Sequence, residues 1–500
     1  MKKTPGKQPL TPDQFTNDPD VIACVNELKK KFGDDYKKLT VSDTYDDQGH
    51  QYVNLVQKGG GVLGIALVGY TYILEQAGIR FLRMAGTSAG AINTALLTAI
   101  GNKEDAKSPK LLQYLCDLDF FSLVDGDRFV RLLTRTFITH KDFAVKVKLW
   151  ATIIASTFLA FVIGDFVFWL LGKRDPAYYP MANVCVTVTG FMMIAIALAG
   201  AYAGFLRKRL IKENYGLNPG DVFYKWVKDR LEENGVKTVA DLNSKASQHV
   251  ALNVRKPETQ DPSTLFGDVT FITSELVSGN KIEFPRMAKL FRADPNDLHP
   301  AEFVRSSMSI PFFFQSHIIT DIKVDDPIIS NEWKETFLID DVALKAAIPV
   351  TARFVDGGIL SNFPISIFYN PDIIVPRLPS FGIDLDDGTG CDATGQDAQN
   401  WPLAKYLGNM FNTVRSYYDK DFLIKNSVLE KGIGKISLAE FNWLNFFLSD
   451  DDKKQMFIRG AQTAKEFLLN FNWDDYQKNR AKIQVTLNSK NKKTTEKAVY

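Results

Sequence analysis

Residues 80–90 read RFLRMAGTSAG and join a strand-like stretch to a helix-like one through a turn of small residues. Residues 80–85 have the length and apolar content of a short strand, whereas residues 89–100 are rich in Ala and Leu, as helices are. Ser88 is therefore predicted to occupy a sharp strand-to-helix elbow. The backbone of such an elbow is strained and its neighbours must lack bulk, a requirement that Gly86 and Gly90 meet.

A second glycine-rich turn lies upstream of the elbow. Residues 52–57, YVNLVQ, form the predicted strand that leads into it, and the turn itself reads GGGVLG over residues 59–64. Clustered backbone N–H groups can stabilise the negatively charged oxygen of a tetrahedral intermediate. We therefore interpret the turn as an oxyanion loop, whose glycines are Gly59, Gly60, Gly61 and Gly64.

The same turn also matches the GxGxxG pattern of dinucleotide-binding folds. Such a fold needs an acidic residue about 20 positions further on to hold the ribose hydroxyls. Residues 78–86 contain no acid, and no Gly-Lys-Ser/Thr follows the glycines to form a phosphate-binding loop of the Walker type. The oxyanion-loop interpretation is therefore favoured over nucleotide binding.

A third motif, Asp356-Gly357-Gly358, offers a base for the serine. A serine hydroxyl needs a neighbouring base to become a good nucleophile, and Gly357 and Gly358 would let the carboxylate approach the elbow closely. The chain has five histidines: His50, His140, His249, His299 and His317. None follows Asp356, so the Ser-Asp-His order of α/β-hydrolases cannot use it. A dyad of Ser88 as nucleophile and Asp356 as proton acceptor is the simpler prediction; a rearranged triad through His317 is the alternative.

Taken together, these motifs resemble the patatin-like phospholipases, lipid acyl hydrolases that use a Ser-Asp dyad. Residues 59–64 are similar to the family's oxyanion loop, residues 86–90 to its nucleophile elbow, and residues 356–358, with Asn362 and Pro364 after them, to its base motif. Residues 305–314, RSSMSIPFFF, are similar to a further conserved stretch of the family. Leu63 stands where the family often has a basic residue. The resemblance implies an α/β fold with a three-layer hydrolase core and no metal or organic cofactor.

Two long apolar runs separate the elbow from the base motif. Residues 149–171 carry a single charged residue, Asp165, and residues 181–206 carry none. Each run exceeds the roughly 20 helical residues that cross the hydrocarbon core of a bilayer. Because only a short polar turn at 173–180 joins them, they are predicted to form a transmembrane hairpin inserted into the core. Two helices buried in a soluble bundle are the alternative.

Charge predicts the orientation of the hairpin. Basic residues cluster outside it, at 141–148 and 207–212, so both flanks are predicted to be cytosolic by the positive-inside rule. An even number of crossings would also allow Ser88 and Asp356 to meet on one side of the membrane. Because residues 1–6 lack a following apolar segment, we expect no signal peptide, and membrane delivery would come from the hairpin. The protein is thus expected in a membrane with two spans, with both termini and the catalytic core cytoplasmic.

The predicted organisation has five parts. They are a polar N-terminal extension at 1–45, the first part of the core at 46–140, the hairpin at 141–212, the second part of the core at 213–390, and a helical C-terminal region with a basic tail at 391–500. Residues 401–416 and 453–471 show apolar repeats at helical spacing, whereas the prolines of residues 371–387 predict a loop region.

Composition limits the range of functions. The formal net charge of +2 gives no general attraction to nucleic acid, and the cysteines Cys24, Cys116, Cys185 and Cys391 form neither a disulfide nor a zinc pattern. The sequence therefore predicts a membrane-anchored hydrolase of lipid acyl esters, with a membrane lipid as substrate and the bilayer as partner. A transacylase that uses the same dyad and an inactive membrane-anchored interaction protein are the alternatives.

Overall fold

The computed structural model describes residues 10–127, 131, 143–255, 265–388 and 403–482, and the chain divides into two compact units. The first unit comprises Met1–Val124, Gly220–Pro311 and Ser316–Tyr500, and the second comprises Asp125–Pro219 and Phe312–Gln315. The second unit is thus an insertion in the sequence of the first. Each unit is described by itself.

The first unit is an α/β structure built on a ten-stranded sheet whose main path is β12-β11-β2-β3-β6-β10-β9. Its strands are β1 (Thr44–Asp46), β2 (Gln51–Gln57), β3 (Ile79–Thr87), β5 (Leu252–Val254), β6 (Asp268–Glu275), β7 (Asn280–Phe284), β9 (His317–Ile319), β10 (Ala352–Asp356), β11 (Ser380–Asp386) and β12 (Ile433–Ser437). Strands β12, β11, β2, β3 and β6 pair in parallel, and β10 runs antiparallel to β6 and β9. The turns that follow β2 and β3 therefore meet at one edge of the sheet.

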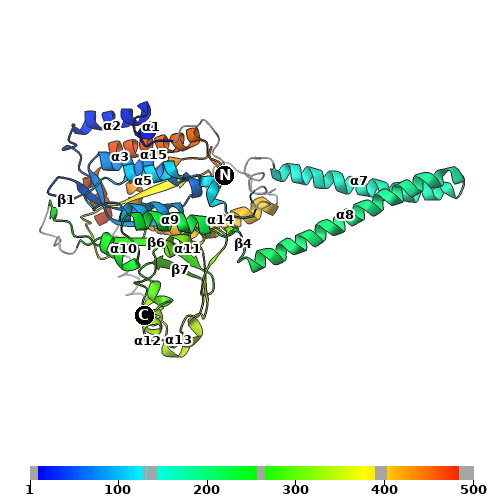
Figure 1. Ribbon diagram of the computed structural model, residues 1–500. Helices are drawn as coiled ribbons and strands as arrows, with labels where there is room; N and C mark the ends of the chain where they lie inside the picture. The colour runs from blue at the N-terminus through cyan, green and yellow to red at the C-terminus, as the bar shows by residue number, and fades with distance from the viewer. Residues whose placement is uncertain (1–9, 128–130, 132–142, 256–264, 389–402, 483–500) are drawn as a thin grey trace, which may run out of the picture. The chain divides into compact units, whose positions relative to one another are not determined.

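Helices cover both faces of this sheet. They are α1 (Asp13–Thr16), α2 (Pro19–Phe32), α3 (Gly64–Gln76), α4 (Ala89–Ala99), α5 (Ser108–Asp117), α9 (Asp221–Glu233), α10 (Val239–Ala246), α11 (Ala301–Ser307), α12 (Pro327–Phe337), α13 (Asp341–Ala347), α14 (Leu403–Lys425) and α15 (Asp450–Asn470). Figure 1 shows α2, α3 and α15 on one side of the sheet and α9, α10 and α11 on the other. Every residue of β2 is buried, as expected of a central parallel strand.

Two glycines allow α3 and α15 to pack closely. A Cβ at Gly69 of α3 would lie 2.0 Å from the carbonyl oxygen of Phe457, and one at Gly460 of α15 would lie 2.0 Å from that of Ala66. Glycine is therefore required on both sides of the contact. Because α3 begins directly after the glycine turn at 59–64, this packing also fixes the position of that turn.

The strand and helix predictions largely agree with the structure. The predicted strands at 52–57 and 80–85 correspond to β2 and β3, and the helical repeats at 401–416 and 453–471 fall in α14 and α15. The prediction of a loop over residues 371–387 holds for residues 371–379 but was wrong for the rest, because Ser380–Asp386 forms β11 inside the parallel sheet. The prolines that suggested a loop end at Pro379, and the strand begins at the next residue.

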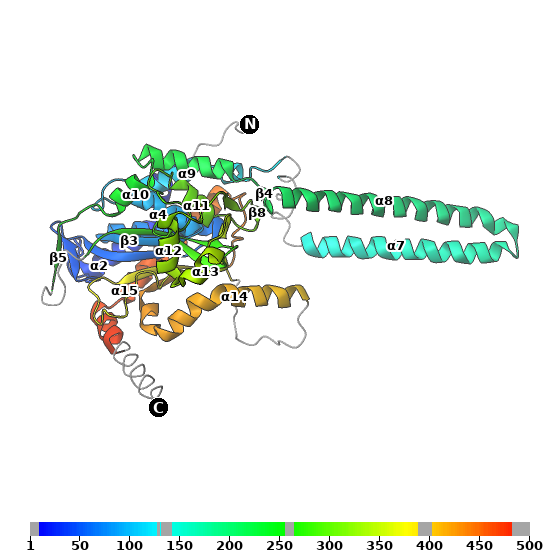
Figure 2. The same cartoon turned by 90° about the horizontal axis from the view of Figure 1, so that it is seen from below.

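The second unit contains two long helices, α7 (Phe143–Gly172) and α8 (Tyr179–Lys212), and a two-stranded parallel sheet of β4 (Gly216–Asn218) and β8 (Phe312–Phe314). Figures 1 and 2 show α7 and α8 side by side, joined by a short turn. Segments Lys148–Gly172 and Pro176–Lys212 are long and apolar enough to cross a membrane, and almost none of their residues are buried. Two such helices are compatible with a membrane hairpin but are weak evidence for one.

Candidate active site

Ser88 occupies a strained turn between β3 and α4. Its backbone has φ 55° and ψ −120°, a conformation that side-chain-bearing residues rarely adopt. The flanking glycines are required by close packing: a Cβ at Gly86 would lie 2.3 Å from the carbonyl carbon of Gly90, and one at Gly90 would lie 2.3 Å from the carbonyl oxygen of Gln57. The serine is thus held at the N-terminus of α4, where the helix dipole favours negative charge.

Residues of the 305–314 stretch form hydrogen bonds with this elbow. The Ser88 N–H donates to the hydroxyl of Ser307 at 2.9 Å, and that hydroxyl donates to the carbonyl of Ile272 on β6 at 2.5 Å. The Ser88 hydroxyl itself donates to the sulfur of Met308 at 3.0 Å. The structure therefore gives two residues of this stretch, Ser307 and Met308, direct contacts with Ser88.

Asp356 ends β10 and is buried close to the elbow. Its Oδ1 accepts the N–H of Gly358 at 2.7 Å, whereas its Oδ2 has no hydrogen-bond partner among the described residues. Burial raises the pKa of Asp356 above its ordinary value, and the nearby Ser88 hydroxyl, the Gly358 N–H and the charge of Arg415 oppose that rise. A buried carboxylate oxygen without a partner, near a serine hydroxyl, is a suitable proton acceptor.

The glycines after Asp356 bring its loop against the elbow. A Cβ at Gly357 would lie 2.2 Å from the carbonyl oxygen of Ile272 and 3.0 Å from Cγ2 of Thr87, the residue before Ser88. The hydroxyl of Thr87 donates to the carbonyl of Ser361 at 3.0 Å. The structure therefore brings together two motifs that lie far apart in the sequence.

The loop at 59–64 lies against the same residues. A Cβ at Gly59 would lie 2.9 Å from Cβ of Ser88 and 2.5 Å from Oδ1 of Asn362. The N–H of Gly59 donates to the carbonyl of Asn362 at 3.0 Å, and the N–H of Gly64 bonds to Gly61 within the first helical turn. In the described part of the chain, the N–H groups of Gly60 and Gly61 have no backbone acceptor.

Two pockets adjoin this centre. The first is apolar, and its lining includes Gly61, Gly64, Ala89 and Met308 together with the side chains of Ile65, Ile92, Leu115, Leu118, Phe120 and Phe223. The second has a volume of about 490 Å³ and a mixed lining, in which Lys58, Asn362, Asp384 and Arg415 lie beside Phe363 and Leu423.

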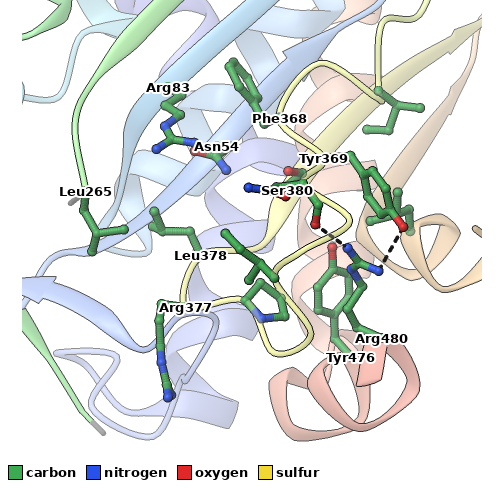
Figure 3. Close-up of a pocket in the computed structure, with 15 residues that line it drawn as sticks. Asn54, Arg83, Leu265, Phe368, Tyr369, Arg377, Leu378, Ser380, Tyr476 and Arg480 are labelled. Carbon is green, nitrogen blue, oxygen red and sulfur yellow. Dashed lines mark hydrogen bonds between the residues drawn. The ribbon is translucent and has the colours of Figure 1, made fainter. Parts of the chain in front are cut away.

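A further pocket, whose lining does not include Ser88, is shown in Figure 3. Asn54 of β2 and Arg83 of β3, which are paired across the sheet, form part of its lining. Arg480 donates to the hydroxyl of Tyr369 at 3.2 Å and to the carbonyl of Asn370 at 3.0 Å. These contacts tie the C-terminal region to the segment after the base motif, and none of the predicted site residues lines the pocket.

The histidines lie apart from this arrangement where they are described. His50 bonds to Asp46, with 3.0 Å between Nδ1 and Oδ2, and His317 pairs with Phe354 across β9 and β10. Burial lowers the pKa of His317 to about 4, so its imidazole is neutral near pH 7. No hydrogen bond joins a histidine to Ser88 within the described ranges, and His140 lies outside them.

The α/β fold and a family match together define an enzyme that hydrolyses ester bonds. The model of the family described as patatin-like phospholipase matches residues 55–369, and the chain belongs to this family. This family match confirms the resemblance that the motifs predicted. It ends before α14 and α15, which therefore lie outside the matched region.

Individual relatives add little about activity. The uncharacterized protein YqhO of Bacillus subtilis (strain 168) is 25% identical over 417 residues, which cover 83% of this chain and 98% of YqhO. The crystal structure of VipD from Legionella pneumophila matches with a TM-score of 0.32 and 14% identity, over 84% of this chain and 67% of VipD. The structure of the ExoU-SpcU complex from Pseudomonas aeruginosa gives a TM-score of 0.29 and 14% identity, over 85% of this chain and 52% of the matched chain.

Proposed function

We propose that the protein is a membrane-anchored serine hydrolase that cleaves acyl esters of membrane phospholipids through a dyad of Ser88 and Asp356. The observation that carries the proposal is the convergence at one edge of the sheet of three groups. They are the Ser88 hydroxyl, the unpartnered Oδ2 of Asp356, and the N–H groups of Gly60 and Gly61. These are the nucleophile, the base and the oxyanion donors that acyl transfer needs.

In the proposed cycle, Asp356 Oδ2 accepts the proton of the Ser88 hydroxyl while Oγ attacks the ester carbonyl carbon. The carbonyl electron pair moves to the oxygen, which the N–H groups of Gly60 and Gly61 stabilise. The intermediate collapses, and the leaving alcohol of the lipid takes the proton back from Asp356. A water then attacks the acyl-enzyme with Asp356 again as base, which releases the fatty acid and restores Ser88. Gly59 and Gly64, whose N–H groups are engaged elsewhere, shape the loop instead of donating.

The apolar pocket beside Ser88 supports a lipid as substrate. Its lining combines Gly61 and Ala89, the sequence neighbours of Gly60 and Ser88, with aliphatic and aromatic side chains. An acyl chain of the substrate would occupy it, because such a lining stabilises apolar surface that leaves water. Substitution of Ile92, which is partly exposed in this lining, by Trp would shorten the pocket. We expect Ile92→Trp to retain hydrolysis of butyryl esters and to lose hydrolysis of palmitoyl esters.

The hairpin of α7 and α8 is proposed as the membrane anchor. An anchor would keep the catalytic unit near its substrate and so raise the local concentration of lipid. Both ends of the hairpin would then lie on the same side of the membrane, which is required because the motifs on its two sides form one site. The basic residues at 207–212 would face the cytosolic headgroups, and the proposed localisation is therefore a two-span membrane protein with a cytoplasmic core.

Fatty-acid release by the full-length protein from liposomes of phosphatidylcholine and phosphatidylglycerol tests this function. We expect Ser88→Ala to abolish release and Asp356→Asn to lower it by about 10²–10⁴-fold, the contribution typical of general-base catalysis. Ser247→Ala, at an exposed serine after α10, is the matched control and should retain full activity. Release that survives Ser88→Ala would contradict the proposal, and transfer of the labelled acyl group to an added alcohol in preference to water would identify a transacylase.

A further inference from the structure

The loop that follows Asp356 is held by two side chains of α14. Arg415 donates through Nε to the carbonyl of Gly358 at 2.8 Å. Asp419 accepts from the hydroxyl of Ser361 at 2.7 Å and from the N–H of Phe363 at 2.8 Å. Arg415 and Asp419 are four positions apart, so both lie on one face of the helix. One helical turn thus binds the catalytic loop at three points.

This loop connects every part of the proposed site. Asn362 binds Gly59 twice, because it accepts the Gly59 N–H at 3.0 Å and its amide donates to the Gly59 carbonyl at 3.2 Å. Ser361 accepts the hydroxyl of Thr87, which precedes the nucleophile. A shift of the loop would therefore move the base, the elbow and the oxyanion loop relative to one another. Misplacement by about 1 Å can cost about 10²-fold in rate.

The guanidinium of Arg415 also lies close to the proposed base. A Cβ at Gly358 would be 2.9 Å from Oδ1 of Asp356 and 3.3 Å from Nη2 of Arg415, so both groups flank the same glycine. A positive charge near a carboxylate favours its ionised form, which is the form that accepts the serine proton. The charge of Arg415 accordingly opposes the rise in the pKa of Asp356 that burial causes.

Other charged or titratable groups face this region from neighbouring elements. Arg305 of α11 donates to the hydroxyl of Ser309, whose carbonyl accepts the N–H of Asp356. Glu275 of β6 and His317 of β9 flank Phe354, two residues before Asp356. Within the described ranges, the charge that acts on the pKa of Asp356 is that of Arg415, and its effect is smaller than that of burial.

We propose that α14 is a positioning element of the active site, in which Arg415 and Asp419 fix the loop at 358–363 and Arg415 holds its guanidinium beside Asp356. The inference rests on the proposed Ser88–Asp356 dyad and extends the machinery to a helix beyond the family match at residues 55–369. Arg415 and Asp419 are positioning residues because they act through the loop and not on the substrate.

The test is the pH dependence of kcat/KM for p-nitrophenyl butyrate, measured on the full-length protein. This ester has no phosphate headgroup, so loss of headgroup binding cannot account for an effect. For Arg415→Gln we expect the acid limb to move to higher pH and kcat to fall about 10-fold or more, with KM little changed. For Arg415→Lys we expect the acid limb to stay in place, because the charge remains, and kcat to fall several-fold. Lys425→Gln removes one charge from the exposed end of the same helix and should match the wild type.

The outcomes separate the two proposals. If the wild type hydrolyses the ester and Arg415→Gln has an unchanged profile, or one shared by Lys425→Gln, the positioning role is wrong while the dyad stands. If the wild type has no Ser88-dependent esterase activity, the proposed function fails, and this inference with it. If circular dichroism shows that Arg415→Gln is unfolded, Arg415→Lys decides: a lowered kcat with an unmoved acid limb supports the role, and wild-type kcat overturns it.

Discussion

The hydroxyl of Ser88 lies 3.0 Å from the sulfur of Met308 and donates its hydrogen bond there, while the nearby Oδ2 of Asp356 has no partner among the described residues. A thioether is a weak acceptor compared with a carboxylate. The hydroxyl therefore has two acceptors within its reach in the proposed mechanism, and only a bond to Asp356 prepares it for attack. Met308 comes from the 305–314 stretch, which gives this stretch a direct contact with the nucleophile.

Replacement of Met308 separates the role of its sulfur as a hydrogen-bond acceptor from its role in packing. Leu has nearly the volume of Met but no acceptor, so Met308→Leu should preserve packing and leave Asp356 as the acceptor of the Ser88 proton. We expect kcat/KM for p-nitrophenyl butyrate to equal or exceed the wild-type value. Met308→Ala should instead lower the free energy of unfolding by about 2–5 kcal/mol, since Met308 is buried. A large loss of activity in a stable Met308→Leu protein would show that the sulfur itself is needed.

A methyl group at Gly59 should push the oxyanion loop and the elbow apart. The Cβ would lie 2.5 Å from Asn362 Oδ1 and 2.9 Å from Ser88 Cβ, so the loop or the serine must move. We expect Gly59→Ala to lower kcat by at least about 10-fold with a smaller effect on KM, because oxyanion donors act in the transition state. Gly204→Ala in α8, where a Cβ meets no atom within 4 Å, should leave the esterase rate unchanged. Equal rates for the two variants would contradict the placement of the loop.

Stability should depend on the protonation of Asp419. Burial raises the pKa of its carboxyl from 3.8 to about 6. Between these pH values the folded protein retains a proton that the unfolded chain has released, so this residue makes the free energy of unfolding fall as the pH rises through that window. The free energy of unfolding of Asp419→Asn relative to the wild type should therefore increase from pH 4 to about pH 6 and level off above it. Chemical denaturation across this range measures the two free energies of unfolding. A difference that does not change with pH would contradict a raised pKa of Asp419.

The hairpin predicts a difference in labelling between its turn and the core. Ala177, between α7 and α8, would lie on the side of the membrane opposite to Asp451, which is exposed at the start of α15. In intact cells a membrane-impermeant maleimide should label Ala177→Cys, whereas Asp451→Cys should react only after permeabilisation. Equal labelling of both variants in intact cells would contradict a two-span topology with a cytoplasmic core.

Much of the proposed site could be predicted from short motifs, because their chemistry depends on local backbone geometry. The elbow required Gly86 and Gly90, and the structure shows the reason, because a Cβ added at either glycine would lie 2.3 Å from a backbone atom. Strand β11 was missed because Pro371, Pro376 and Pro379 precede it and conceal its start. Such errors arise where the signal for a loop lies next to that for a strand.

The long-range contacts around the loop at 358–363 could not be predicted in this way. Arg415 and Asp419 belong to no motif, and an Arg and an Asp spaced four residues apart on a helix are usually a solvent-exposed pair. Trp443, whose carbonyl accepts the N–H of Val62 in the oxyanion loop at 3.1 Å, likewise had no signal in the sequence. These contacts depend on how the C-terminal region folds back onto the sheet.

The reaction of Ser88 with a fluorophosphonate tests the central claim most directly. Intact-mass and peptide analysis of the treated protein should find a single adduct on Ser88, none in Ser88→Ala, and a rate lowered about 10²-fold or more in Asp356→Asn. An unmodified wild-type protein, an adduct on another residue, or an undiminished rate in Asp356→Asn would contradict a dyad in which Asp356 activates Ser88.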